Sequence, residues 1–232
     1  AYWRALTMLL LLDEQPTAVE KMLGESDKAP LVDAMVGLCL GMQTGREDVK
    51  QRYLARLAQV DGEHDLPSLY RLLVLLAGPN VDKARAEAKA IANSMGQDVV
   101  NELVGFVGSG RDGELALLLR ASMLMDMGFN RQAAEGTMRG LKARPACQWA
   151  AALILGCEPP LKMLGEAVNT LQPPNTQIAQ AMRIRQLTRE RKFSELVQLY
   201  DQLYQADKEN VGLLAQQAWA TSVCGQHEKA LE

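Results

Sequence analysis

The sequence predicts an all-α protein built from short helices, and three observations support this fold class. Leucine and alanine, two strong helix formers, supply 36 and 30 of the 232 residues, whereas valine, isoleucine and threonine number only 15, 4 and 8. Apolar residues recur at helical spacing in segments of about 10 to 17 residues. Glycine- and proline-rich turns separate these segments, and none alternates strictly between apolar and polar residues, so we expect no strands.

The predicted helices follow one another along the whole chain, and short turns between them make consecutive helices antiparallel. Gly45, Gly128 and Gly225 mark three of the turns, and Pro145 marks another. We expect helices over residues 1–13, 16–25, 29–43, 46–60, 65–77, 80–95, 97–108, 112–127, 129–143, 146–156, 160–171, 175–190, 192–206, 209–224 and from 226 onward.

The helices recur in pairs with a period of about 34 residues. In the pair at 114–145, the first helix carries Leu117, Ala121 and Leu124, and the second carries Ala133, Thr137 and Leu141. A second copy of the pattern spans 177–232, in which Phe193 and His227, like Leu196 and Ala230, are 34 positions apart. One such pair cannot bury its apolar face alone, so the pattern predicts stacked hairpins that share a continuous core.

This pattern resembles the tetratricopeptide repeat (TPR) family. The family's small residue in the first helix corresponds to Gly37, Ala121 and Ala218, and its small residue early in the second helix corresponds to Ala84, Ala133 and Ala230. Pro145 matches its late proline, whereas the Trp and Tyr landmarks are mostly absent. The resemblance implies a right-handed α-solenoid with degenerate repeats, and one such domain over 1–232, clearest at 114–145 and 177–232 and more degenerate over 1–110.

In such arrays the first helix of each pair lines a concave groove, and a cluster of basic residues lies on one of these helices. Arg185 and Arg189 are four residues apart and therefore share a face of the predicted helix, and Trp219 stands 34 residues after Arg185. Arginine pairs hold carboxylates through two parallel hydrogen bonds, so this face predicts a site for an acidic or C-terminal peptide. The alternative is a solvated basic face, with Trp219 in the core between repeats.

The same face of the helix that begins near residue 112 carries a different set of side chains. Leu115, Leu118, Ser122 and Met125 would form an apolar peptide groove if part of this stripe were exposed. The alternative is that the stripe belongs to the core. We name Ser122 and Met125, together with Arg185, Arg189 and Trp219, as candidate partner-binding residues.

Residues with catalytic or metal-binding chemistry are sparse and scattered. Cys39, Cys147, Cys157 and Cys224 form no close pair of the kind that zinc sites use, and the two histidines, His64 and His227, are far apart in sequence. We therefore predict no metal site, no cofactor and no enzymatic activity, with the cysteines acting as small hydrophobic residues.

Charge and hydropathy narrow the class of partner. The net charge of −3 provides no basic field for nucleic acid, and no apolar run approaches the roughly 20 residues that a membrane span needs. We predict a protein or peptide partner, no nucleic acid and no membrane span. Four cysteines without an evident pairing favour a cytoplasmic location.

The last helical pattern stops without a cap, so we expect the chain to be a fragment of a longer protein whose uncovered ends allow self-association. The leading hypothesis for function is a non-catalytic scaffold that binds a partner peptide or helix on its concave face, or organises a multiprotein assembly. The alternative is an accessory solenoid of a larger enzyme or of a membrane-associated or secretion protein whose active part lies outside this fragment.

Overall fold

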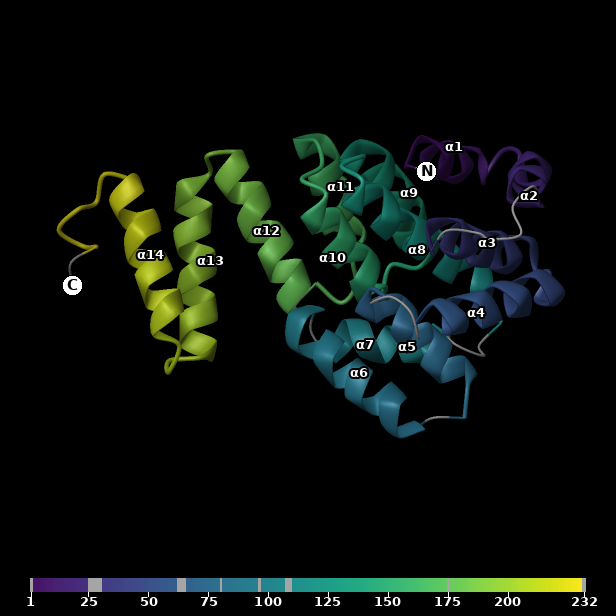
Figure 1. The fold of residues 1–232 in the computed structure, drawn as a ribbon. Helices are drawn as coiled ribbons and strands as arrows, with labels where there is room; N and C mark the ends of the chain where they lie inside the picture. The colour runs from purple at the N-terminus through teal and green to yellow at the C-terminus, as the bar shows by residue number, and fades with distance from the viewer. Residues whose placement is uncertain are drawn as a thin grey trace. The chain divides into compact units, whose positions relative to one another are not determined.

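A computed structural model describes residues 2–24, 31–61, 66–79, 81–95, 97–106, 110–174 and 176–230 of the chain. These residues form fourteen helices and no strand, so the all-α class is confirmed (Figure 1). The helices are α1 (Tyr2–Leu11), α2 (Pro16–Gly24), α3 (Leu31–Thr44), α4 (Glu47–Asp61), α5 (Ser68–Ala77), α6 (Val81–Met95), α7 (Gln97–Phe106), α8 (Asp112–Asp126), α9 (Asn130–Ala143), α10 (Gln148–Gly156), α11 (Leu161–Thr170), α12 (Gln177–Arg189), α13 (Phe193–Ala206) and α14 (Val211–Val223).

All fourteen agree with predicted helices to within a few residues, and one prediction is wrong. The segment from 226 onward forms turns over 227–230 rather than a helix. A single helical hydrogen bond, from the Ala230 amide to the Gln226 carbonyl, closes it over 3.1 Å. One turn fixes several dihedral angles for one hydrogen bond, and only further turns repay that cost.

The chain divides into two compact units, 1–158 and 159–232. In unit 1, α3 lies at the centre and packs against α4 on one side and α8 on another, and α9 pairs with α8. The predicted core positions Ala121, Leu124, Ala133, Thr137 and Leu141 are all buried there. The expectation of a single solenoid over 1–232 stays a prediction.

The contact between α3 and α4 depends on two glycines. A Cβ atom on Gly37 would lie 2.4 to 2.5 Å from the ring of Tyr53, and one on Gly41 would lie 2.5 Å from the backbone nitrogen of Lys50. Side chains at these positions would therefore push the two helices apart. The small-residue spacing at 37 and 41 permits the close contact within this hairpin.

Four of the helices end in the same turn. Gly45, Gly128 and Gly225 follow α3, α8 and α14 with positive φ angles of 66°, 80° and 79°, and Arg191 takes this place after α12 with φ of 56°. In each turn the next amide donates to the carbonyl five residues back, as from Phe129 to Leu124 over 2.8 Å. This is the Schellman ending of a helix, which favours glycine because a Cβ atom crowds the left-handed conformation. Residues 191 and 225 are 34 apart, so the turn shares the spacing of the predicted repeat.

Replacing Arg191 with glycine is expected to raise the free energy of unfolding by about 0.5 to 1 kcal/mol. The left-handed conformation costs a residue with a Cβ atom roughly 1 to 2 kcal/mol, and the greater freedom of glycine in the unfolded chain offsets part of that gain. Urea denaturation followed by circular dichroism measures the change. Arg191→Ala is the control, because it removes the side chain and keeps the strain; equal stability of the two variants would contradict the prediction.

Ion pairs also join distant helices of unit 1. The carboxylate of Asp13, in the turn between α1 and α2, accepts hydrogen bonds from Arg120 of α8 and Arg139 of α9. The side chain of Gln43, on α3, donates to the same carboxylate over 3.1 Å. Burial acts to raise the pKa of Asp13, but the hydrogen bonds and charges of the two arginines outweigh it and lower the pKa from 3.8 to about 2. One acidic side chain thus connects the first turn of the protein to three helices.

A second acidic side chain caps a helix from outside that helix. The carboxylate of Glu102, on α7, accepts hydrogen bonds of 2.8 Å from the amides of Gln148 and Trp149 at the start of α10. The first amides of a helix have no partner within it, and a negative charge near them is favourable. Glu102 therefore has a structural role.

Unit 2 consists of α11 to α14, in which each helix packs on the next along the chain. Its core contains Leu187, Leu196, Tyr200 and Ala220, with Phe193 and Leu203 partly buried against them. The helices begin at conventional caps, as where the side chain of Asn210 accepts a hydrogen bond of 3.3 Å from the Leu213 amide. Since α14 is the last described helix, one of its faces has no following helix in the described chain.

Candidate functional site

The most unusual surface of the described protein lies on α14. This helix of 13 residues contains no charged side chain, although most of one face is exposed. The exposed fractions of Val211, Leu214, Trp219 and Val223 lie between 44% and 73%. A helix surface that faces water normally carries charged residues, and one that lacks them is normally covered. We call this surface the α14 face and define it by Val211, Leu214, Ala215, Ala218, Trp219, Ser222 and Val223.

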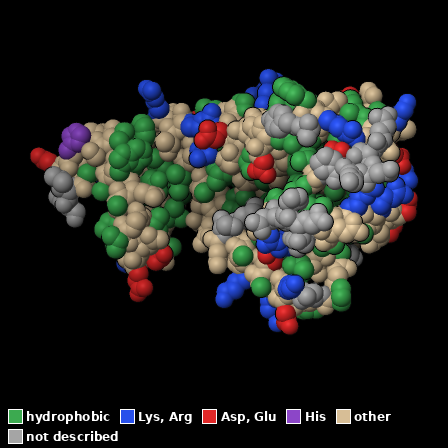
Figure 2. All heavy atoms as spheres, in the orientation of Figure 1, with side chains coloured by type: hydrophobic (Ala, Val, Ile, Leu, Met, Phe, Trp, Pro, Cys, Tyr) green, Lys and Arg blue, Asp and Glu red, His purple; other side chains and the backbone are tan. Residues whose placement is uncertain are grey.

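A shallow groove runs between α13 and the α14 face. Its volume is about 660 Å³. Its apolar lining comes mainly from Val197 of α13 and from Val211, Leu214, Ala215 and Ala218 of α14, with Gln198, Asp201 and Gln217 along one side. The side chain of Gln217 donates to Asp201 over 3.2 Å, which fixes that polar side. Figure 2 shows hydrophobic side chains gathered over α13 and α14, with charged side chains toward the ends of the two helices. The groove can therefore receive an elongated apolar object such as a helix.

The predicted basic cluster lies on α12, where neighbouring groups occupy part of it. The guanidinium of Arg189 is exposed but donates to the carbonyl of Pro159 over 2.6 Å. Arg185 is half-buried on the same helix. Arg183 pairs with Glu195 of α13 over 3.2 Å. A role of Arg185 and Arg189 in binding a carboxylate stays a prediction, and the bond to Pro159 must be exchanged before Arg189 can bind a ligand.

Trp219 is half-exposed, so it does not lie in a core between repeats as one alternative supposed. The centroid of its ring lies 6.2 Å from that of Phe193, with the ring planes at 85°. This edge-to-face contact holds the indole against the start of α13 while leaving much of its surface open to a partner.

Ser122 and Met125 do not form the apolar groove that one interpretation of the sequence placed there. Leu115 and Leu118 are 1% and 2% exposed, and Ser122, at 9%, donates its hydroxyl to the Leu118 carbonyl of its own helix. Met125 is partly buried, with its sulfur close to Gly156 of α10. The stripe belongs to the core because α3 packs against α8, so the alternative interpretation describes the structure.

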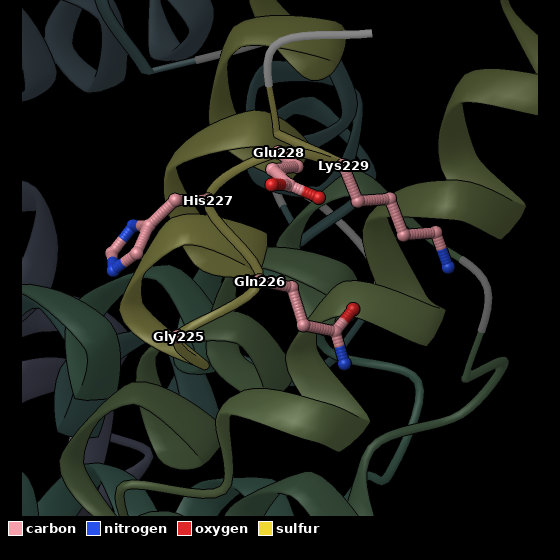
Figure 3. Close-up of a pocket in the computed structure, with 5 residues that line it drawn as sticks. All are labelled: Gly225, Gln226, His227, Glu228 and Lys229. Carbon is pink, nitrogen blue, oxygen red and sulfur yellow. The ribbon is translucent and has the colours of Figure 1, made fainter.

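A hollow at the end of the described chain lies within the turn from Gly225 to Lys229 and has a volume of about 640 Å³. The Ser222 hydroxyl lies 3.1 Å from Nδ1 of His227, which brings a nucleophile and a base together. Figure 3 shows, however, that the side chains of Gln226, His227, Glu228 and Lys229 point in different directions, with the Glu228 carboxylate away from the imidazole. A catalytic centre needs groups that converge on one reacting atom, and this turn does not provide that arrangement.

The cysteines behave as core residues where the structure buries them. Burial raises the pKa of Cys39 and of Cys147 to about 12 and that of Cys157 to about 11, so these thiols stay protonated and unreactive at neutral pH. Within the described residues, no group of three or more histidine, cysteine, aspartate or glutamate side chains is placed to hold a metal ion. His64 lies outside the described residues.

No helix among the described residues is both long and apolar enough to cross a membrane. Comparison of the chain with models of protein families, with curated proteins and with solved structures gave no match. The resemblance to tetratricopeptide repeats and the right-handed superhelix therefore stay predictions.

Sequence reasoning identified Trp219 but missed most of the α14 face. A signal was present, because residues 211–223 form the only predicted helix in the second half of the chain that lacks charged residues over such a length. The pattern predicted a helix there without indicating how much of it a neighbour covers.

Proposed function

We propose that this protein is a non-catalytic helical-repeat scaffold that binds a helix of a protein partner in the groove between α13 and α14. The observation that carries the proposal is the α14 face, which is exposed, apolar and uncharged. Water-exposed apolar surface of this kind marks protein interaction sites, and a partner helix can cover it with residues at positions i, i+3, i+4 and i+7.

The details of the groove support a helix as the occupant. Ala215 and Ala218 are small and let a partner backbone approach closely, while Leu214 and Trp219 stand on either side of them around the helix. Tryptophan is among the residues most often found to dominate binding energy, and Trp219 is already held in place by Phe193. The repeats, similar to those of the tetratricopeptide family, would supply the rigid support.

The test is selection of helical peptides from a displayed library on the full chain, followed by affinity measurements with two variants. Ala215→Arg places a charge in the groove lining, and Gln216→Arg places the same charge on the next exposed residue of α14, outside that lining. We expect selected peptides to bind the parent and Gln216→Arg alike, and to bind Ala215→Arg at least tenfold more weakly, because the guanidinium would be desolvated on binding.

Failure to enrich any helical peptide, or equal affinity for the two arginine variants, would exclude the groove as the binding site. Thermal melting of both variants must match the parent, which the exposure of positions 215 and 216 leads us to expect.

A further inference from the structure

We propose that the helix that occupies the α14 face is α14 of a second copy of this chain, packed antiparallel about a two-fold axis near Ala218. This inference rests on the proposed function, because it names the partner of the same groove. It would make the protein a symmetric dimer through unit 2.

The spacing of residues on α14 suits such a pairing. Val211, Ala215, Ala218 and Ser222 are separated by four, three and four residues, which is the alternation that keeps one seam facing a partner helix. All four are exposed or partly exposed, and three of them are small. Small residues along a seam let two helix backbones come close together, and Leu214 and Trp219 can then pack across the flanks.

The absence of charge on this helix favours a second copy as partner. Two identical surfaces that each carried charges would bring like charges together on the axis, whereas α14 has none among its 13 residues. An isologous contact requires a surface that is complementary to itself, and an uncharged seam of small residues meets that requirement.

The charges beyond the ends of α14 decide between the parallel and antiparallel arrangements. Asp207 and Glu209 lie exposed just before the helix, and Lys229 lies exposed after it. An antiparallel pair centred on Ala218 places Lys229 of each chain beside Asp207 and Glu209 of the other. A parallel pair would bring the acidic ends together. The antiparallel arrangement also opposes the two helix dipoles.

A helix of 13 residues is about 20 Å long, so this interface is small compared with those of permanent dimers. The dimer should therefore dissociate at micromolar concentrations, and its population should depend on protein concentration.

The test is analytical ultracentrifugation of the full chain from low micromolar to several hundred micromolar concentration. We expect the parent to shift from the mass of one chain to that of two, Gln216→Arg to do the same, and Ala215→Arg to remain a single chain throughout. A parent that stays monomeric, or equal behaviour of the two arginine variants, would overturn the dimer. Peptide binding by a monomeric parent would leave the proposed function standing, so the two failures are distinguishable.

Charge exchange tests the orientation without placing a charge in the seam. Lys229→Glu alone should weaken the dimer roughly threefold to tenfold at low salt, because it turns two attractions per dimer into repulsions. Adding Glu209→Lys to the same chain should restore the parent dissociation constant. Failure of this second change to restore dimerisation, in a chain that dimerises, would overturn the antiparallel arrangement.

Discussion

The variant Asp13→Ala is expected to unfold with a free energy about 3 to 5 kcal/mol lower than that of the parent. Asp13 is the carboxylate partner of Arg120, whose side chain is only 5% exposed. Removing the carboxylate leaves the guanidinium buried without its counter-charge, and it also releases Arg139 and Gln43, which join α9 and α3 to the same group. Urea denaturation followed by circular dichroism measures the loss.

The control is Glu14→Ala, which removes the same charge from the next, exposed residue and should change stability by less than about 0.5 kcal/mol. The double variant Asp13→Ala/Arg120→Met should recover much of the loss, because it removes the unpaired charge while keeping an apolar side chain in the core. If Asp13→Ala were no less stable than Glu14→Ala, the ion pair would not form in solution.

The contribution of Asp13 should also depend on pH. Its pKa is about 2 in the folded protein and 3.8 ordinarily, so the folded state favours the charged form. The stabilisation is therefore fully present above about pH 4 and is lost as the pH falls toward 2. The difference in urea midpoint between the parent and Asp13→Asn should shrink over this interval, and a difference that stays constant would contradict the assignment.

The variant Gly41→Val is expected to lower the free energy of unfolding by about 3 kcal/mol, at the upper end of the cost of overpacking. The new Cβ would lie 2.5 Å from the backbone nitrogen of Lys50 and 2.8 Å from its Cα. Backbone atoms of α4 cannot rotate away as a side chain can, so the helices must separate and the core between them loses contacts. Thermal and urea denaturation both report the change.

Gly105→Val is the matched control, because a Cβ on Gly105 in α7 meets no atom within 4 Å. There valine should be neutral or slightly stabilising, since glycine is a poorer helix former. Equal effects of the two substitutions would show that helix propensity, and not the contact between α3 and α4, controls stability at position 41.

Local pattern was enough to predict the helices because each depends on residues close in sequence. Helical spacing of leucine and alanine, with glycine or proline at the turns, located all fourteen helices. Gly45, Gly128 and Gly225 were predicted as turns because their type favours the conformation they adopt, whereas Arg191 was not, since its type does not. The pattern failed from residue 226 onward, where a sequence suited to a helix forms only one turn.

Contacts between distant residues were beyond the reach of the pattern. Nothing near Asp13 indicates that Arg120 will lie against it 107 residues later, and nothing near Glu102 indicates that it will cap α10. The sequence likewise left two interpretations open for Ser122 and Met125, and the packing of α3 on α8 decided that the stripe is core.

The sequence by itself therefore determined the fold class, the helices, most of the turns and the positions where small residues permit close contact. The tertiary structure decided which apolar faces are covered. Burial depends on the neighbour that a helix meets rather than on the helix itself, and for this reason α8 and α14, both with apolar stripes, have opposite fates. The stripe of α8 is enclosed by α3, and that of α14 stays exposed as the surface to which we assign binding.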